Sequence, residues 1–461
     1  MRLRPCFALL LGLQLLPALA QQAPPAAPAT PAPQPSSSQP QPPPAEVAPA
    51  DDPDAAETAA TKVPLDEIRR FVGVFDAVRE AYVEPVTDRQ LMQSAIKGLL
   101  LDLDPHSAYL EKDDAEAFDE ETNGAYAGIG VEVQVQPDGT IKVVSPIDDT
   151  PAARAGIKSG DVITAVDGKP VDGEDDDSQG PLRGAPGTKV TLTLERAGVA
   201  KPFDITLKRE TIRIASVRGR MLEPGLGYIR IVAFQADTAA DFEHQLDLLQ
   251  GSSGKALHGL VLDLRSNPGG LLTSAVQIAD DLLDAGKIVS TRGRIAISDS
   301  LFSATPGDRA HGVPIVALVD AGSASAAEVL AGALTDNHRA RIVGSRTFGK
   351  GSVQTLLPLD NGDSVKLTTA RYYTPSGKSI QARGITPDVV LRPATGAVNG
   401  GHTDYAEVLL PGHLRGEGEG EAGSNAGDVL DGDAPITAAL SELKKLVPGT
   451  TASVPKVKTS K

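Results

Sequence analysis

The sequence predicts an α/β core, built as a mixed sheet with flanking helices, together with an inserted smaller domain and a preceding helical region. Apolar runs of strand length that alternate with helical segments indicate the core, which is expected over 212–395. These runs lie at 226–234, 260–264, 313–319 and 341–343. Short alternating runs bounded by glycine-containing turns indicate the inserted domain over 124–211. The helical region is expected over 62–123.

Residues 1–20 have the pattern of a secretory signal peptide. Arg2 and Arg4 form the positive end, and an apolar run too short to span a bilayer follows. Ala18-Leu-Ala20 supplies the small residues of a cleavage site. Export is therefore expected, with cleavage near Ala20 and a periplasmic or secreted mature protein.

Composition narrows the possible functions. Cys6 is the only cysteine and would leave with the signal peptide, which excludes cysteine catalysis and cysteine-ligated zinc. The formal charge of −16 argues against nucleic acid and anionic membrane surfaces as partners. Residues 21–61 are rich in Pro, Ala, Gln and Ser without periodicity, which predicts an extended, disordered linker.

Apolar residues at helical spacing predict an amphipathic helix near the start of the 62–123 region. They are Leu65, Ile68, Phe71, Val72, Phe75, Val78 and Tyr82. A second helix is expected over 88–101, followed by a turn that contains His106. No partner ligand stands at metal-binding spacing from His106, so we expect a role in the turn or in packing.

A glycine-rich loop opens the inserted domain. Gly128, Ile129, Gly130 and Val131 stand where successive backbone N–H groups can converge on a chain-terminal carboxylate. The strand expected at 131–135 alternates as an edge strand does when it accepts an added peptide. The loop and the strand together predict a site that binds the C-terminus of a protein.

Ser325 stands between the apolar strand at 313–319 and a helix that is expected to begin at this serine. A strand-to-helix turn exposes a nucleophile beside the backbone N–H groups of the helix start. A serine hydroxyl also needs a base, and none of the seven histidines has a triad-like setting.

Lys350 is the candidate base. It lies between Gly349 and Gly351, which permit close backbone approach, and it follows Phe348, which can shield the amine from water. Loss of water disfavours the charged amine and lowers its pKa, which makes it a usable base.

Both residues have other interpretations. Ser325-Ala-Ala-Glu328 is also a capping box, in which the serine satisfies helix N–H groups. The segment 344–350 fits a phosphate-binding loop up to its last position, where Gly351 replaces the hydroxyl residue that would hold magnesium. The residues after Gly351 have strand character, so nucleotide binding is the less favoured hypothesis.

The segments GSASAAE (322–328) and TFGKGSVQ (347–354) resemble those of the carboxyl-terminal processing proteases, tail-specific peptidases with a Ser–Lys dyad. The resemblance implies that Ser325 is the nucleophile, that Lys350 is the base and that Gln354 orients the lysine amine. Asp320 and Ala327 differ from the Asn and Ser of many members. The resemblance also implies an oxyanion hole formed by the backbone N–H groups of Gly270 and Ala326.

Residues 124–211 resemble a PDZ domain, on the glycine loop and on the segment Gly160-Asp-Val-Ile-Thr-Ala-Val-Asp-Gly168. Arg183 corresponds to an arginine that contacts the protease core in the family, and a surface salt bridge is the alternative.

Asp336 matches a family acid that influences activity, although a role at the helix end is favoured. In some members the N-terminal helices dimerise, which implies a homo-oligomer; a simple packing layer on the core is the alternative.

The resemblance implies a periplasmic serine endopeptidase that captures protein C-termini and needs no metal or nucleotide. Envelope proteins or cell-wall enzymes are the implied substrates, with an adaptor protein as a possible partner. A non-catalytic PDZ scaffold is the competing interpretation. The C-terminal region, 396–461, predicts a Gly/Glu-rich linker over 416–427, a closing helix over 436–446 and a disordered basic tail.

Overall fold

The computed structural model describes residues 63–136, 138–171, 180–252, 257–393, 406–417, 419 and 427–447. The expected signal peptide, the Pro/Ala-rich linker, most of the Gly/Glu-rich segment and the basic tail lie outside these residues. The chain divides into two compact units, 1–76 and 77–461. Within the described ranges, no helix has the length and apolar character needed to cross a membrane.

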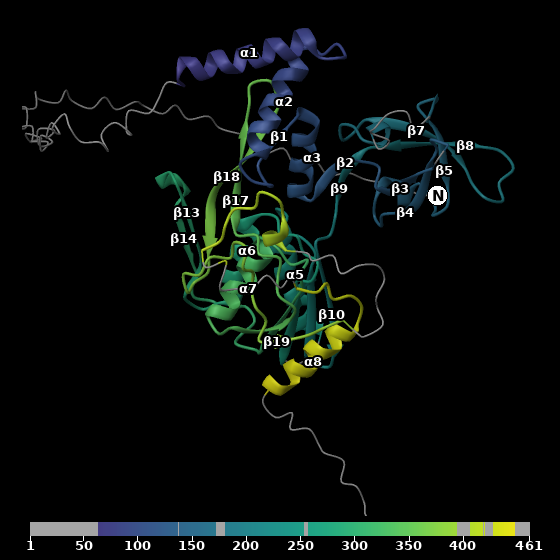
Figure 1. Ribbon diagram of the computed structural model, residues 1–461. Helices are drawn as coiled ribbons and strands as arrows, with labels where there is room; N and C mark the ends of the chain where they lie inside the picture. Colours follow the sequence, from purple (N-terminus) through teal and green to yellow (C-terminus); the bar gives the residue numbers. More distant parts are fainter. Residues whose placement is uncertain are drawn as a thin grey trace, which may run out of the picture. The chain divides into compact units, whose positions relative to one another are not determined.

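Helix α1 (Leu65–Ala81) confirms the helix predicted from apolar spacing (Figure 1). None of its residues is buried, and the apolar stripe is exposed, with Phe71 at 47% and Val72 at 46%. The rings of Phe71 and Phe75 lie 6.5 Å apart. An apolar stripe in contact with water is the kind of surface that a partner helix covers.

Helix α2 (Asp88–Leu101) begins where Thr87 and Gln90 form a capping box, in which each satisfies a backbone N–H of the other. The predicted turn follows, because Asp104 accepts the amides of His106 at 2.8 Å and Ser107 at 3.0 Å. Strand β1 (Ala108–Leu110) and helix α3 (Lys112–Asn123) come next.

The inserted domain has its own sheet and its own hydrophobic core. Strand β2 (Ala125–Gly128) leads into it and pairs antiparallel with β9 (Glu210–Arg213), which leads out. The sheet order is β3-β4-β5-β7-β8, with β6 paired to β5. The elements are β3 (Val131–Val135), β4 (Ile141–Pro146), α4 (Pro151–Arg154), β5 (Val162–Val166), β6 (Lys169–Pro170), η2 (Gly180–Leu182), β7 (Lys189–Glu195) and β8 (Phe203–Lys208). Strand β3 is at the end of this order, so it is the edge strand that the sequence predicts.

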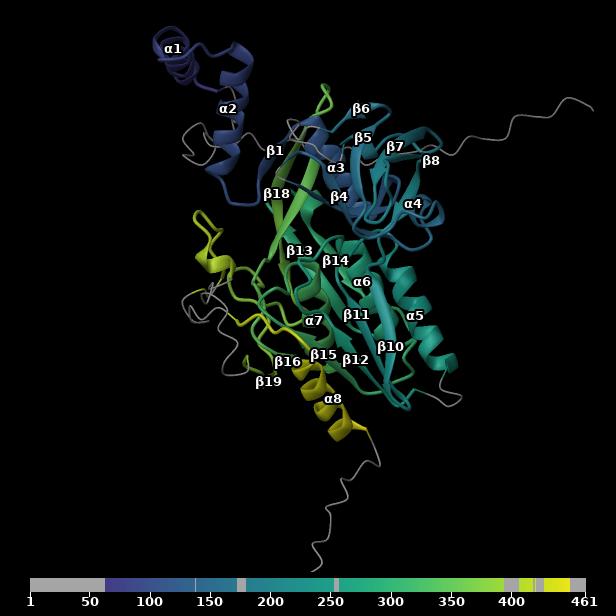
Figure 2. The same ribbon diagram turned by 90° about the vertical axis from the view of Figure 1, so that its right-hand side faces the viewer.

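The central sheet of the core has the order β10-β11-β12-β15-β16-β19, which can be followed in Figure 2. Its strands are β10 (Val217–Glu223), β11 (Leu226–Ile231), β12 (Gly259–Asp263), β15 (Ile315–Val319), β16 (Ala340–Gly344) and β19 (Val389–Val390). Strands β11 to β19 are parallel and β10 is antiparallel, which confirms a mixed sheet.

Helices cover both faces of this sheet, which is why every residue of β12 and β15 is buried. On one face, alternate residues such as Ile315 and Ala317 join a core with α5 (Thr238–Ser252), α6 (Leu272–Leu282) and α7 (Ala326–Asp336). On the other face, Val316 and Leu318 pack with α8 (Ala434–Leu446). The predicted closing helix is confirmed, and it completes the core.

A second sheet has the order β1-β18-β13-β14, with β17 paired to β18. Its remaining strands are β13 (Lys287–Gly293), β14 (Ser300–Ser303), β17 (Ser352–Pro358) and β18 (Ser364–Tyr373), with η3 (Ala296–Ser298) between β13 and β14. Strand β17 begins two residues after Lys350, so this sheet holds one end of the segment that carries the candidate base.

Candidate active site

Ser325 occupies the predicted strand-to-helix turn, between the end of β15 and the first residue of α7. Its φ of 53° and ψ of −116° lie outside the regions that a non-glycine residue prefers. Such a conformation costs about 1–3 kcal/mol and persists only where the surroundings impose it. The side chain is largely buried, with 8% of the residue exposed.

Hydrogen bonds from neighbouring loops impose this conformation. The Ala324 amide donates to the Asn267 carbonyl at 2.9 Å, and the Ser323 hydroxyl donates to the Leu264 carbonyl at 2.8 Å. Asp320 is fully buried and accepts the amides of Ser266, Gly322 and Leu430. A carboxylate with three amide donors is satisfied, so Asp320 holds the turn before Ser325.

The glycine loop after β12 lies against the nucleophile. A Cβ on Gly269 would be 2.7 Å from the Ser325 Cβ, so only glycine fits here. The Gly269 carbonyl accepts the Phe234 amide at 2.8 Å, and the N–H of Gly270 therefore points away from Phe234, because the peptide is trans. Neither this amide nor that of Ala326 has an acceptor within the described part of the chain, so both donors remain available.

The segment that carries Lys350 needs its two glycines. A Cβ on Gly351 would be 2.2 Å from the Gln381 amide nitrogen, and Gly349 has a φ of +95°. The predicted close backbone approach is thus confirmed. Strand β17 follows Gly351, where a phosphate-binding loop requires a helix, so the nucleotide hypothesis is wrong.

Burial lowers the pKa of the Lys350 amine, and the positive charge of Lys366 lowers it further. The carboxylates of Glu407, Glu328 and Asp104 act in the opposite direction. Because burial dominates, the net shift favours the neutral amine, as a general base requires.

Glu328 joins the two candidate catalytic residues. Its Oε2 accepts the amides of Ser325 and Lys350, each at 2.9 Å, so the two amide nitrogens lie within about twice that distance of each other. Its Oε1 accepts the Gly349 amide at 2.7 Å and the Thr347 hydroxyl at 2.5 Å. Burial raises the pKa of this carboxyl to about 7, although these hydrogen bonds lower it.

The sequence marks Glu328 only as half of a capping box, and its Oε2 does accept the Ser325 amide as that motif requires. Its contacts with Thr347, Gly349 and Lys350 come from a segment about twenty residues later. No local signal could predict them.

Within the described residues, no hydrogen bond joins Ser325 Oγ to Lys350 Nζ, or Gln354 to Lys350. The Gln354 amide donates to the hydroxyls of Ser352 at 3.0 Å and Thr368 at 3.1 Å, differing from the position that the resemblance implies. The β17–β18 register shifts between Val353 and Gln354, which accounts for the altered direction.

The glycine loop of the inserted domain has the geometry of a carboxylate site. The amides of Ile129 and Gly130 have no acceptor in the described part of the chain, while their carbonyls accept the amides of Ala152 and Ile147. Gly130 has a φ of +80°, and a Cβ there would be 2.3 Å from Thr150. Ile129 is only 1% exposed and belongs mainly to the domain core, where the sequence suggested a pocket wall.

A small pocket adjoins this loop, lined by Tyr126, Ile129, Gly130, Val131, Val133, Leu182 and Arg183. The Arg183 guanidinium lies 5.5 Å from the Tyr126 ring centroid and forms an ion pair with Glu120 of α3. Its partner is therefore on the helix that precedes the inserted domain. Within the part of the chain that the structure describes, the hydrogen bonds and ion pair of Arg183 involve no residue of the central sheet.

Two further candidates have structural contacts. Asp336 accepts the Ser376 amide at 3.0 Å; burial raises its pKa, but hydrogen bonds from Thr374 and Ser376 lower it overall. His106 lies in the predicted turn, and its Nε2 also meets both Glu407 oxygens at 2.8 and 3.0 Å. No local pattern in the sequence predicts this contact, because 301 residues separate the pair.

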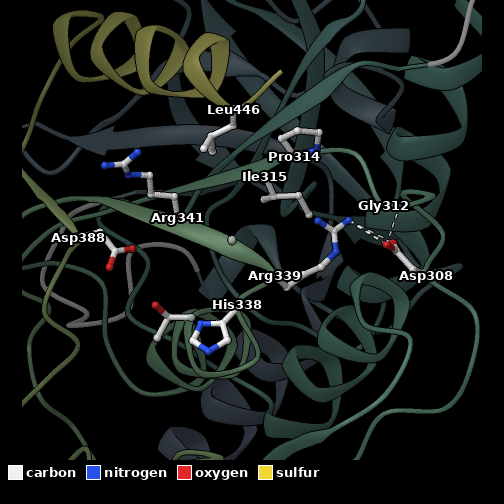
Figure 3. A pocket seen from close by; sticks show the side chains of 11 residues that line it. Asp308, Gly312, Pro314, Ile315, His338, Arg339, Arg341, Asp388 and Leu446 are labelled. Atoms are coloured by element: carbon white, nitrogen blue, oxygen red, sulfur yellow. Dashed lines mark hydrogen bonds and ion pairs between the residues drawn. The ribbon is translucent and has the colours of Figure 1, made fainter. Parts of the chain in front are cut away.

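A cavity of about 580 Å³ lies elsewhere on the core (Figure 3). Its lining includes Ile315 and Ala340, the first residues of β15 and β16, whereas Ser325 and Lys350 follow the last residues of those strands. Arg339 lines the cavity, and its guanidinium pairs with Asp308 at 3.0 Å. The cavity is therefore at the opposite end of the parallel strands from the candidate catalytic residues.

Comparisons with known proteins agree with these features. Peptidase family S41 matches residues 225–391, the PDZ domain matches 127–207, and the N-terminal domain of the activating protease CtpB matches 40–114. The carboxy-terminal-processing protease of Bartonella bacilliformis is 43% identical over 386 residues, which are 83% of this chain and 88% of that protein. The carboxy-terminal processing protease CtpA of Bacillus subtilis is 38% identical over 317 residues, 68% of this chain and 67% of that protein. A solved structure, the photosystem II D1 C-terminal processing protease, is 34% identical and has a TM-score of 0.41, with 70% of this chain and 92% of that chain covered.

Proposed function

The chain belongs to the carboxy-terminal processing proteases of peptidase family S41, and from this premise we propose that it is an exported endopeptidase with Ser325 and Lys350 as its catalytic dyad. It is a serine peptidase that carries a PDZ domain. The observation that carries the dyad is Glu328, which binds the amides of both residues through one oxygen. A shared acceptor brings a strained serine and a desolvated lysine into one site.

The reaction is acyl transfer through a covalent intermediate. The Ser325 Oγ attacks the scissile carbonyl carbon while Lys350 accepts the hydroxyl proton, and the amine then returns this proton to the leaving nitrogen. Water, deprotonated by the same amine, hydrolyses the acyl-serine and releases the acid product. The available amides of Gly270 and Ala326 stabilise the oxyanion of each tetrahedral intermediate.

Gln354 has a conditional role in this mechanism. Its Nε2 is held by Ser352 and Thr368, while its Oε1 has no donor within the described residues. This oxygen can accept a hydrogen bond from the Lys350 amine once the amine turns toward Ser325. The glutamine would then fix the direction of the base.

Substrates are proteins with accessible C-terminal tails. The tail carboxylate binds the free amides of Ile129 and Gly130 and the tail extends along the edge strand β3, as expected when a peptide adds to a sheet. Envelope proteins or cell-wall enzymes, presented by an adaptor, fit an exported enzyme. Arg183 connects this pocket to Glu120 on α3, and a gating role for it rests on that contact.

Two further features belong to the proposal. The pattern of 1–20 supports export to the periplasm, with a mature chain that begins at Gln21. The exposed stripe of α1, in a segment that matches the CtpB N-terminal domain, supports a homo-oligomer formed through N-terminal helices. N-terminal sequencing of the exported protein tests the first feature, and sedimentation of a Phe71→Glu variant tests the second.

The dyad is tested with purified Ser325→Ala and Lys350→Ala variants and an unfolded protein such as casein. Each variant is expected to lose at least about a thousandfold in kcat/KM, because the chemical step depends on both groups. Thermal unfolding checks that each variant remains folded. Cleavage at the wild-type rate by either folded variant would refute the dyad.

A further inference from the structure

The segment that carries Lys350 is held by a second set of hydrogen bonds, separate from those of Glu328. The Phe348 carbonyl accepts the backbone amide of Glu407 at 2.9 Å. The Gly351 amide donates to Gln381 Oε1, also at 2.9 Å. Lys350 therefore lies between two hydrogen-bonded positions that depend on Glu407 and Gln381.

These two side chains also bind each other. Gln381 Nε2 donates to Glu407 Oε1 at 2.8 Å, which closes a ring from the Phe348 carbonyl to the Gly351 amide. Both residues are fully buried. Glu407 belongs to η4 (Glu407–Leu409), beyond the residues that match the peptidase family. A segment outside the matched domain thus contributes to the environment of the candidate base.

A buried carboxylate must have a partner for its charge. An unpaired charge costs several kcal/mol in an interior, and removing one member of a buried pair is strongly destabilising. His106 supplies the partner, because its Nε2 is within hydrogen-bond distance of both Glu407 oxygens and 16% of its side chain is exposed. The Nε2 contact with both oxygens offsets part of the Glu407 charge.

The charges around Lys350 come from four separate elements. Burial lowers the pKa of the Lys350 amine most, and the positive charge of Lys366 on β18 lowers it further. Three negative charges raise it, those of Glu407, of Glu328 on α7 and of Asp104 after α2. Glu407 itself faces His106 and Gln381. A change in the Glu407–His106 pair must therefore alter the electrostatic environment of the amine.

We propose that Glu407 is a positioning residue for Lys350, and that its pairing with His106 balances the negative charge beside the lysine amine. This inference rests on the proposed role of Lys350 as general base. Glu407 does not contact the reacting atoms. It acts by fixing the lysine segment and by setting the charge next to it.

The test is the pH profile of kcat/KM for the full chain with a fluorogenic peptide, in wild type, Glu407→Gln and His106→Gln. Glutamine in place of Glu407 removes a negative charge, so the neutral amine is favoured and the rising limb should move to lower pH. Glutamine in place of His106 removes the imidazole that offsets part of the Glu407 charge, so the limb should move to higher pH. Each displacement is expected to reach at least about 0.3 pH unit, a twofold change in kcat/KM on the rising limb.

Displacements of the rising limb in opposite directions in the two variants indicate charge coupling. Simple damage to the fold would lower activity in both variants without moving the limb in opposite directions. Glu419→Gln is the matched control, because Glu419 forms another Glu–His pair, with His413, and is partly exposed. It should leave the profile in place. If Glu407→Gln unfolds, the His106→Gln profile still decides the question.

Displacements below 0.3 pH unit in both variants, or in the same direction, would overturn the inference. They would leave the proposed function intact as long as the wild-type rising limb is lost in Lys350→Ala. An active Lys350→Ala variant would instead overturn the dyad itself. The two failures are therefore distinguishable.

Discussion

Replacement of Glu328 by Gln should separate the positioning of the dyad from the stability of the fold. The carboxylate accepts four donors, from Ser325, Lys350, Gly349 and Thr347. An amide group keeps one acceptor oxygen, and its NH₂ group faces two of these donors. The Thr347 hydroxyl can turn and accept, so at least one buried backbone N–H loses its acceptor, at a cost of about 1–3 kcal/mol.

The loss of a buried charge offsets this cost. The folded-state pKa of Glu328 is about 7, raised from 4.5, so the folded protein binds the proton more tightly than the unfolded chain does. Stability from this group is complete below about pH 4.5 and is lost as pH rises through about 7, a change of roughly 3 kcal/mol. Glutamine does not titrate, so at pH 8 the free energy of unfolding of the variant should lie within about 2 kcal/mol of the wild-type value.

Activity should nevertheless fall. The Gly349 amide, next to Lys350, would lose its acceptor, so the segment that carries Lys350 would shift relative to Ser325. A displacement of catalytic groups by about 1 Å costs on the order of a hundredfold. We expect kcat at pH 8 to fall about 10- to 100-fold, with KM nearly unchanged. The assay is steady-state peptide cleavage, and urea unfolding at pH 5 and pH 8 measures stability.

Asp281→Asn is the matched control. Burial raises the pKa of Asp281 to about 6, and its Oδ2 is buried without a partner in the described residues. Asparagine should therefore increase stability at pH 8 and leave kcat unchanged, since Asp281 lies near the end of α6. A Glu328→Gln variant with kcat within twofold of wild type would refute the positioning argument.

The other predictions follow from the same geometry. Because burial and Lys366 favour the neutral amine, wild-type kcat/KM should rise with pH through an apparent pKa below that of free lysine, and His338→Ala should leave this profile unchanged; loss of activity in folded His338→Ala would indicate another base. Lys350→Arg should be inactive at every pH tested, since guanidinium does not deprotonate, and any wild-type-like cleavage contradicts this. A substrate peptide with an amidated C-terminus should bind about ten- to a hundredfold more weakly than the free acid, by ~1.5–3 kcal/mol, measured by calorimetry; equal binding would exclude carboxylate capture. Arg183→Ala should lower kcat and retain the preference for acid over amide, because it removes the ion pair with Glu120 and leaves the loop amides; unchanged kcat would exclude a gate.

Local patterns were enough to predict much of this protein. Apolar residues at helical spacing predict α1, and continuous apolar runs of strand length predict the strands that helices cover on both faces. The serine before α7, the glycines on both sides of Lys350 and the loop before β3 are also local, since each depends on the backbone of a few residues. These features suffice for the fold class and for the identity of the candidate dyad.

The tertiary structure decided the environment of those residues. Glu328 meets Lys350 across 22 positions of the chain, and His106 meets Glu407 across 301, contacts that exist only after α2, α7 and the C-terminal segment have packed. The direction of the Gln354 amide depends on a register shift between β17 and β18. Burial, and with it the pKa of a lysine or a glutamate, is a property of all the atoms that exclude water from a site, and segments far apart in the sequence supply those atoms here.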